Sequence, residues 1–451
     1  MKRAVSTLVL LLLVALMATS VSFVHTAVSP IASPVTLLWT NPMEVFDVKV
    51  AGDGAHLAAV NSSPSGLYFF SYDNSTPVWW WLDTADVPLS VAISFDGNQV
   101  AVGTSTGFVH YFDGCLLRSG VQGSETWRSI DLGGAIERRT IDMSDDGQIV
   151  VVGGTGDAVY YFAGCRARSG STEATTWLDY PTQCLEIFAV DLSPDGQFIA
   201  VGGSKFAPGG GFVAYYMQAS TPPFPKNEVW NARSSIAEPI SDIKVSDDGY
   251  SVAAVSGLIV ATLHYWRNSA GLAGDPLDTW NNTLPYACVD TSADGNEVVA
   301  GKPLPAICGI HFWANARSLT GINVSESWSR HEGELVPDVA INKAGTVLAA
   351  VAARFNAGTE YFAYFYRADG VSMGEFQLDS ASDKVSMSNS GETVVVGGAV
   401  IDSLYVFIIQ VPETVGGTIV FGDLQVIAPL LICSAAVAVG LVALIGMRKK
   451  L

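Results

Sequence analysis

The chain has 451 residues, with 43 acidic and 24 basic side chains and a formal net charge of −19. All of the acidic residues lie between Arg3 and Arg448, whereas five of the basic residues lie at the two ends. The long central part is therefore strongly negative. This excludes nucleic acid and anionic lipid as its partners, because both bind to positive potential.

Residues 1–27 have the pattern of a secretory signal. Lys2 and Arg3 precede an apolar stretch, Leu8–Met17, and small residues follow it up to Thr26-Ala27. We expect this segment to be a signal peptide that is removed on export, and an uncleaved membrane anchor is the alternative.

A motif recurs eight times along the chain: an apolar run, a turn of the type Ser/Asn-x-Asp-Gly, and a second apolar run. The turn glycines are Gly54, Gly97, Gly147, Gly196, Gly249, Gly295, Gly345 and Gly391. Their mean spacing of about 48 residues is typical of a propeller or a solenoid, and it overrides the expectation of several domains from length alone.

Each repeat is predicted to be a four-stranded antiparallel blade with strands a to d. Strand a leads into the Asp-Gly turn, where glycine supplies a positive φ. Strand b is short and apolar, as in Val150–Gly153, which suits a strand that is buried on both faces. Strand c ends in paired aromatics, as in Tyr160–Phe162. Strand d carries an aromatic marker: Trp39, Trp79–Trp81, Trp127, Trp177, Trp230, Trp280, Trp328 and Phe376.

The two ends of the array complement each other. The last repeat has a strand c at Leu404–Gln410 but no strand d, whereas the array begins with an isolated strand d at Val35–Thr40. We therefore expect an all-β, eight-bladed β-propeller over residues 35–410, in which the N-terminal strand closes the last blade. A seven-bladed ring with one additional unit is the alternative.

Two families of repeats are similar to this motif. The turn Ser193-Pro194-Asp195-Gly196, followed by a small apolar strand, resembles WD40 repeats. The strand Gly107–Phe112, its polar loop and the closing Trp127 resemble the repeats of quinoprotein-type (PQQ-like) propellers, which also have eight blades. The resemblance implies the fold and says little about activity. Regular Trp-Asp dipeptides and an adjacent Cys-Cys pair are both missing, and the chain is short for a quinoprotein dehydrogenase.

The C-terminal residues predict a membrane anchor. Residues 426–447 contain no charge, and at about 1.5 Å per residue they would form roughly 33 Å of helix, enough to cross a bilayer. The basic residues in the tail 448–451 place the C-terminus in the cytoplasm. We expect a single-pass protein of the cell membrane with an extracellular propeller and a short stalk at 411–425.

Five cysteines lie outside the predicted membrane span, so at least one has no partner within the chain: Cys115, Cys165, Cys184, Cys288 and Cys308. Cys115 and Cys165 occupy the same place in the c–d loops of consecutive blades. Cys288 and Cys308 would begin strands a and c of one blade, about 9.5 Å apart, which exceeds the Cα separation that a disulfide spans. We predict that this pair does not form a bridge.

Four Asn-x-Ser/Thr sequons are candidate N-glycosylation sites: Asn61, Asn74, Asn281 and Asn323. All four fall in predicted loops or at the end of a strand.

The order of the strands determines which loops share a face. The Asp-Gly turns and the c–d loops lie on one face, from which the stalk leaves, and the b–c and d–a loops lie on the other. We expect binding to use this second, outward face. The candidate residues are Arg138, Arg139, Lys205, Phe206, Lys302 and Arg354.

The sequence contains no motif for catalysis or for a cofactor. His110, His264 and His311 occupy equivalent positions of different blades and cannot meet at one metal ion. Glutamates on the outward d–a loops could hold a cation, but no calcium-loop spacing supports this: Glu137, Glu186, Glu238 and Glu334.

We therefore predict a non-catalytic binding or scaffold module without a cofactor, whose partner is a protein or a glycan. The alternative is an exported quinoprotein-like oxidoreductase that uses pyrroloquinoline quinone and calcium.

Overall fold

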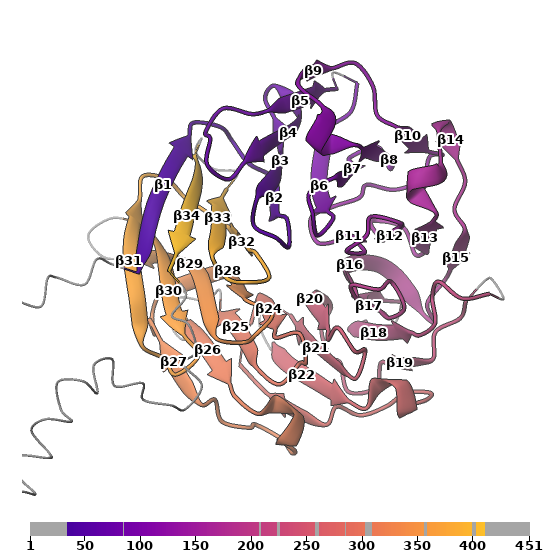
Figure 1. Ribbon diagram of the computed structural model, residues 1–451. Helices are drawn as coiled ribbons and strands as arrows, with labels where there is room; N and C mark the ends of the chain where they lie inside the picture. The colour runs from indigo at the N-terminus through magenta and orange to yellow at the C-terminus, as the bar shows by residue number, and fades with distance from the viewer. Residues whose placement is uncertain are drawn as a thin grey trace, which may run out of the picture. The chain divides into compact units, whose positions relative to one another are not determined.

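The computed structural model describes residues 34–410, except 84, 207–208, 223–225, 258–260, 285, 303–308, 356–358 and 399–402. In this part of the chain, 34 strands form eight sheets. The sheets are arranged as the blades of a ring, with one strand of each near the centre (Figure 1). The predicted eight-bladed β-propeller is thus confirmed, and the seven-bladed alternative is wrong.

Every blade has four antiparallel strands in the order a-b-c-d from the centre outward. Strands a are β2 (Asp47–Val50), β6 (Pro88–Ile93), β11 (Ile141–Met143), β16 (Cys184–Leu192), β20 (Ile240–Val245), β24 (Cys288–Thr291), β28 (Leu335–Ile341) and β32 (Lys384–Met387). Strands b are β3 (His56–Ser62), β7 (Gln99–Thr104), β12 (Ile149–Val152), β17 (Ile199–Lys205), β21 (Ser251–Ser256), β25 (Val298–Lys302), β29 (Val347–Phe355) and β33 (Thr393–Gly397). Strands c are β4 (Ser65–Ser71), β8 (Val109–Asp113), β13 (Val159–Ala163), β18 (Gly211–Tyr216), β22 (Thr262–Arg267), β26 (Gly309–Trp313), β30 (Thr359–Arg367) and β34 (Leu404–Ile409). Strands d are β5 (Trp79–Leu82), β10 (Trp127–Ser129), β15 (Trp177–Asp179), β19 (Trp230–Ala232), β23 (Trp280–Asn282), β27 (Trp328–Arg330), β31 (Ser372–Leu378) and β1 (Val35–Asn41).

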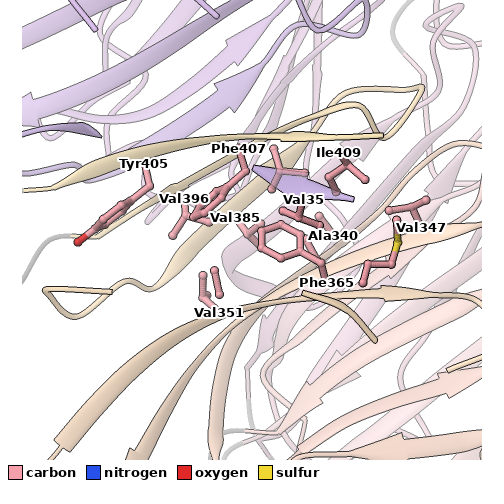
Figure 2. Close-up of a cluster of buried hydrophobic side chains, with 14 of the residues drawn as sticks. Val35, Ala340, Val347, Val351, Phe365, Val385, Val396, Tyr405, Phe407 and Ile409 are labelled. Atoms are coloured by element: carbon pink, nitrogen blue, oxygen red, sulfur yellow. The ribbon is translucent and has the colours of Figure 1, made fainter. Parts of the chain in front are cut away.

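The N-terminal strand closes the ring as predicted. β1 pairs antiparallel with β34, from Val35 opposite Ile409 to Asn41 opposite Leu404. Val35 is 1% exposed and belongs to an apolar cluster shared by blades 7 and 8 (Figure 2). Blade 8 is therefore built from both ends of the array, and its strand c has no free edge.

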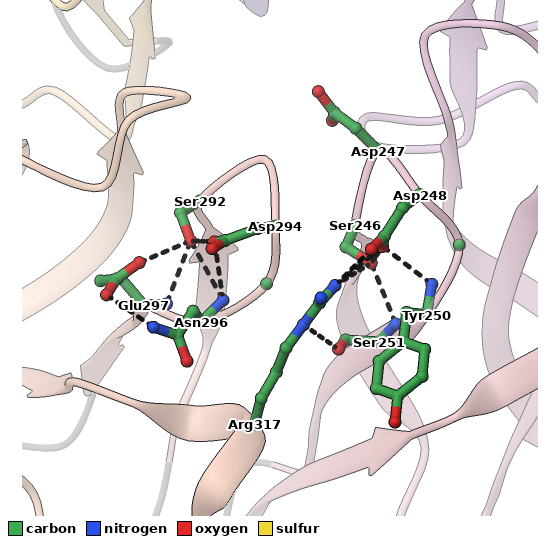
Figure 3. A network of polar contacts seen from close by, with 12 residues as sticks. Ser246, Asp247, Asp248, Tyr250, Ser251, Ser292, Asp294, Asn296, Glu297 and Arg317 are labelled. Atoms are coloured by element: carbon green, nitrogen blue, oxygen red, sulfur yellow. Dashed lines mark hydrogen bonds and ion pairs between the residues drawn. The ribbon is translucent and has the colours of Figure 1, made fainter.

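The Asp-Gly turns are stabilised by a hydrogen-bond pattern that repeats in five blades. In each of these turns the serine hydroxyl donates to the aspartate two residues later, at 2.6–2.9 Å. Two neighbouring turns, at Ser246 and Ser292, appear in Figure 3. Gly249 has a φ of +65°, and a Cβ there would lie 2.3 Å from the Phe198 ring, so this turn requires glycine.

The tryptophans of strands d join neighbouring blades. In seven blades the indole N–H donates to a carbonyl in the c–d segment of the next blade, at 2.6–3.1 Å; the donors are Trp39, Trp79, Trp127, Trp177, Trp230, Trp280 and Trp328. Blade 7 has Phe376 instead, which packs on Phe365 and Phe407. The neighbour of blade 7 is blade 8, whose strand c, β34, leads into the C-terminal residues and is not joined to its strand d, β1, by a c–d loop. Blade 7 therefore lacks the indole donor because blade 8 lacks the loop that would accept its hydrogen bond.

The c–d loops also extend two of the sheets. β9 (Gly120–Gln122) and β14 (Gly170–Glu173) pair in parallel with β5 and β10 of the preceding blades. Single-turn 3-10 helices precede the extension or occupy the same place in other blades: η1 (Cys115–Leu117), η2 (Cys165–Ala167), η3 (Ser269–Gly271) and η4 (Ala316–Ser318). Cys115 and Cys165 occupy equivalent places, as predicted, and both thiols are free.

Cys288 is also a free thiol. Residue 308 lies outside the described part of the chain, so the absence of a bridge between Cys288 and Cys308 stays a prediction.

No helix within the described ranges is long and apolar enough to cross a membrane. The predicted signal peptide (1–27), stalk (411–425), membrane span (426–447) and tail (448–451) all lie outside those ranges.

Candidate functional site in the central channel

The eight strands a surround a channel that is held together by side chains reaching from blade to blade. Six aspartates of these strands each accept a hydrogen bond from a backbone N–H of the next strand a, at 2.8–3.0 Å: Asp47, Asp142, Asp191, Asp242, Asp290 and Asp338. The Ser386 hydroxyl accepts from Val50 in the same way, at 3.1 Å. These carboxylates therefore replace the backbone pairing that adjacent blades cannot form.

One end of the channel is framed by a ring of backbone hydrogen bonds. In each Asp-Gly turn except that of blade 4, a backbone N–H next to the turn serine, or next to the residue that replaces it, donates to a backbone carbonyl of the same turn in the next blade. Phe95 donates in this way to Asp145, and Lys343 donates to Asn389. Pro194 occupies the donor position of blade 4 and has no N–H, so the ring lacks this one bond.

Arg139 closes the other end. It precedes β11 in a left-handed conformation, with φ +67°, and its guanidinium crosses to three other blades. It donates to Asp338 Oδ1 at 2.8 Å and to the carbonyls of Ser241, Ala287 and Pro337 at 3.1–3.5 Å. Asp242 lies 3.7 Å from its Nε. These acceptors belong to the starts of strands a in blades 5, 6 and 7, so Arg139 braces the ring across its centre.

The Arg139 guanidinium keeps Asp338 ionised. Burial alone would raise the pKa of Asp338, but Arg139 and Lys384 together lower it below the ordinary value. The buried pair therefore stays charged at neutral pH.

Asp142 has the opposite shift. Burial, reinforced by the nearby Asp191, raises the pKa of Asp142 to about 6. Lys244 contacts Asp191 at 2.9 Å, and its positive charge limits the rise in the pKa of Asp142.

We predict that Asp142→Asn stabilises the chain at pH 7.5 and has no such effect at pH 4. The folded chain binds the Asp142 proton more tightly than the unfolded chain. The free energy of unfolding therefore falls as the pH rises from about 4 to about 6, and the full loss persists at pH 7.5. A shift of this size corresponds to about 3 kcal/mol at most. The asparagine Oδ1 can still accept the Leu192 N–H. Denaturant titrations of both proteins between pH 4 and 8 measure the effect, and parallel pH profiles would contradict it.

The predicted outward-loop residues fall into two groups. Phe206 is 53% exposed. The five basic residues have partners within the chain. Arg138 contacts Asp383 at 2.6 Å, Lys205 donates to the Arg233 carbonyl at 2.7 Å, and Arg139 lies at the end of the channel as described.

Lys302 and Arg354 are both held by aromatic neighbours. Lys302 ends β25, is only 3% exposed, and its ammonium lies 5.3 Å from the Tyr286 ring centre, so it does not lie on a solvated loop. Arg354 donates to Glu334 at 2.8 Å and stacks on Phe362. Of the six candidates, Arg139 alone lines the channel cavity.

Glu334 is the centre of a compact network and not an exposed cation ligand. Its carboxylate accepts hydrogen bonds from Arg354 and from the Tyr364 hydroxyl at 2.6 Å, and His331 lies 3.3 Å away. Burial alone would raise the pKa of Glu334, but these donors lower it. Within the described ranges, no three His, Cys, Asp or Glu residues form a group that could hold a metal ion.

The strand-c histidines are paired within their own blades. His264 Nδ1 lies 2.9 Å from Asp278, His311 lies 3.3 Å from Glu326, and His110 lies 3.8 Å from Glu125. Burial lowers the pKa of His311 to about 4, so this imidazole is neutral at pH 7.

In blade 5 a hydroxyl completes a Ser-His-Asp arrangement that sequence reasoning missed. Ser256 Oγ lies 3.3 Å from His264 Nε2. Ser256 and His264 are each 2% exposed, and neither lines the channel cavity. The serine alone distinguishes this site from the His-carboxylate pairs of the other two blades. The arrangement satisfies buried polar groups.

We therefore expect a fluorophosphonate probe to leave Ser256 unlabelled in the folded chain, because a substrate cannot reach its hydroxyl. Mass spectrometry of probe-treated peptides measures the labelling, with a serine hydrolase as the positive control. Stoichiometric labelling that is lost in Ser256→Ala would show a reactive nucleophile.

The sequons differ in accessibility. Asn61 lies in β3 and is 2% exposed, and its Oδ1 accepts the Ser63 N–H at 2.7 Å. Asn74 and Asn323 are exposed, whereas Asn281 is partly buried and donates to Asp278.

After expression in a eukaryotic secretion host, we expect a glycan on Asn74 and none on Asn61, because a glycan at the buried position would prevent β3 from packing. Peptide mass spectrometry before and after enzymatic removal of N-glycans gives the occupancy. Efficient modification of Asn61 in folded, secreted protein would contradict the prediction.

Neither a protein-family model nor a curated protein matches the chain. Solved structures with the same fold include the C-terminal WD40 domain of Sif2, with a TM-score of 0.57 and 11% identity over 83% of this chain and 98% of that one. The Dos1 propeller has a TM-score of 0.60 and 10% identity, covering 83% and 95% of the two chains. BamB from Moraxella catarrhalis has a TM-score of 0.57 and 15% identity, covering 83% and 100%. The predicted resemblance to WD40 and PQQ-like propellers is thus confirmed, and at these identities it establishes the fold alone.

Proposed function

We propose that the chain is a membrane-anchored extracellular propeller that binds a protein or a glycan, without catalysis, through the loops of its b–c and d–a face. The observation that carries this proposal is a group of three exposed apolar side chains, the blade 4 patch: Tyr180 in the d–a loop that leads from blade 3 into blade 4, Leu185 at the start of β16, and Phe206 in the b–c loop of blade 4. These side chains are 60%, 44% and 53% exposed.

The patch is held in place by the backbone. The Phe206 N–H donates to the Gln183 carbonyl at 3.0 Å, which ties the b–c loop to the d–a loop. Cys184 pairs with Lys205 in the same sheet, so Leu185 lies beside this junction. Two aromatic rings on anchored loops suit a binding surface, because they offer apolar area with little loss of side-chain entropy.

The proposed membrane anchor rests on the apolar residues 426–447, followed at once by basic residues. β34 ends on the face of the Asp-Gly turns, so a stalk that starts there would leave the blade 4 patch facing outward. Carbonate extraction of membranes from cells that express the full chain tests the anchor, and release of the chain into the soluble fraction would contradict it.

The binding function is tested by proximity labelling with the full chain on the cell surface. We expect Tyr180→Ser, Leu185→Ser and Phe206→Ser together to abolish the labelled partners. The matched control replaces two exposed apolar side chains of a c–d loop, Leu117 and Val121, which are 91% and 64% exposed. The same partners for the wild type and the patch variant would contradict the proposal. Removal of cell-surface glycans distinguishes a glycan partner from a protein.

A further inference from the structure

The channel contains polar groups that its internal pairs leave unused. Three of its five basic residues are paired: Arg139 with Asp338, Lys244 with Asp191 and Lys343 with Asp247. Lys384 and Lys49 also line the channel, and neither ammonium has a hydrogen-bond or ion-pair partner among the described residues. Lys384 is only 8% exposed. Burial, with Arg139 close by, lowers the pKa of Lys384, as expected for a buried ammonium without a bonded counter-charge.

The carboxylates near Lys384 are largely engaged. Asp47 accepts two backbone N–H groups, and Asp338 accepts one and holds Arg139. Asp383 contacts Arg138 through Oδ2, whereas its buried Oδ1 has no hydrogen-bond partner among the described residues. Lys384 can therefore receive a further anion without displacing any of these bonds.

On the acidic side, carboxylate oxygens are also left over. The Asp145 side chain, exposed at the Asp-Gly end of the channel, has no hydrogen-bond partner among the described residues, and one oxygen is left over among the aspartates of strands a. Of the six aspartates in strands a, five have both oxygens hydrogen-bonded: Asp47, Asp191, Asp242, Asp290 and Asp338. Asp142 uses only Oδ2, on the Leu192 N–H, and Oδ1 has no partner in the described part of the chain. Lys49, Lys384 and Asp142 all line the same cavity, so the unused groups of opposite sign face the same space.

That space is a cavity of about 240 Å³ within the channel. It extends from Arg139 at one end to Gly52, Phe95 and Asn389 at the Asp-Gly end. At roughly 30 Å³ per water molecule, it has room for about eight waters or one small polar solute. The Arg139 guanidinium is held across the d–a end, so we expect a ligand to enter at the Asp-Gly end, past Phe95, which is 41% exposed.

We propose that the channel binds a small zwitterion, an amino acid whose carboxylate contacts Lys384 and Lys49 and whose ammonium contacts Asp142. A ligand with both charges complements Lys384, Lys49 and Asp142 together, whereas a simple anion or cation leaves one side of the cavity unpaired. This inference goes beyond the proposed partner binding, which uses the blade 4 loops.

The proposal is tested on the full chain in detergent by isothermal titration calorimetry and thermal unfolding. The probes are glycine, β-alanine and γ-aminobutyrate, which carry the same two charges at increasing separation. We expect saturable binding with an optimum in this series, and at least tenfold weaker binding in Asp142→Asn and Lys384→Met. Saturation distinguishes a site from the general stabilisation that osmolytes produce, which increases steadily with concentration.

The matched control is Arg138→Met, which lies outside the cavity lining and should bind as the wild type does. Sodium acetate and methylammonium chloride at the same ionic strength test each charge alone. If acetate binds as tightly as the zwitterions, or if no probe gives a saturable signal, the proposal is wrong. If Lys384→Met does not fold, Asp142→Asn decides the outcome, because it retains the bond to Leu192. The blade 4 patch variant serves as a further control, and it separates this result from the fate of the proposed partner binding.

Discussion

Deletion of Val35–Asn41 is expected to abolish the cooperative unfolding of the propeller. The deletion removes every backbone partner of β34 on its outer edge and exposes the apolar side chains that Val35 covers. Burial of Val35 alone is worth about 1.5–3 kcal/mol. The deletion also removes the Trp39 hydrogen bond to Tyr72, one of the contacts that join blade 8 to blade 1. Calorimetry should show a midpoint more than about 10 °C lower, or no transition at all.

The same strand provides a control. Leu37 and Leu38 are 38% and 42% exposed, and substitution of both by threonine retains the backbone pairing. We expect this variant to unfold within about 0.5 kcal/mol of the wild type. Size-exclusion chromatography should show association of the deleted protein through its bare β34 edge and none of the control. An unchanged midpoint after deletion would mean that the ring does not depend on its closing strand.

The blades and their closure could be predicted because they depend on local patterns. Each Asp-Gly turn needs a glycine with positive φ, and each strand d has an aromatic residue that packs on strand c. Phe376 shows that even the exception follows the pattern. It replaces the tryptophan in blade 7, and the next blade, blade 8, has no c–d loop that could accept an indole hydrogen bond. The closure could be predicted from the repeat pattern as well, because the first repeat element, at residues 35–41, is the one strand that the last repeat lacks.

The channel could not be predicted, because its contacts join residues far apart in the sequence. Arg139 and Asp338 are 199 residues apart, and each looks like an ordinary loop or strand residue in its own repeat. The bridging aspartates also lack a fixed place: Asp142 lies two residues before its turn serine, whereas Asp242 lies four before Ser246. The periodicity therefore does not align them. Arg138 and Arg139 were expected to bind a partner, and no local pattern indicates that their charges are matched inside the ring.

Arg139→Met is expected to destabilise the chain by about 3–5 kcal/mol, because removal of one member of a buried ion pair leaves the other charge without compensation. Asp338 would lose its 2.8 Å contact, and three backbone carbonyls would lose a donor.

The neighbouring arginine is the control for this prediction. The Arg138–Asp383 pair is about one-third exposed, so Arg138→Met should cost less than about 1 kcal/mol. Adding Asp338→Asn to Arg139→Met should recover part of the loss, because the uncompensated charge disappears while the asparagine oxygen can still accept the Val385 N–H. Urea titrations of the four proteins at pH 7.5 measure these differences. Equal destabilisation by the two arginine substitutions would show that Arg139 is a surface residue in solution and that the ring has no brace across its centre.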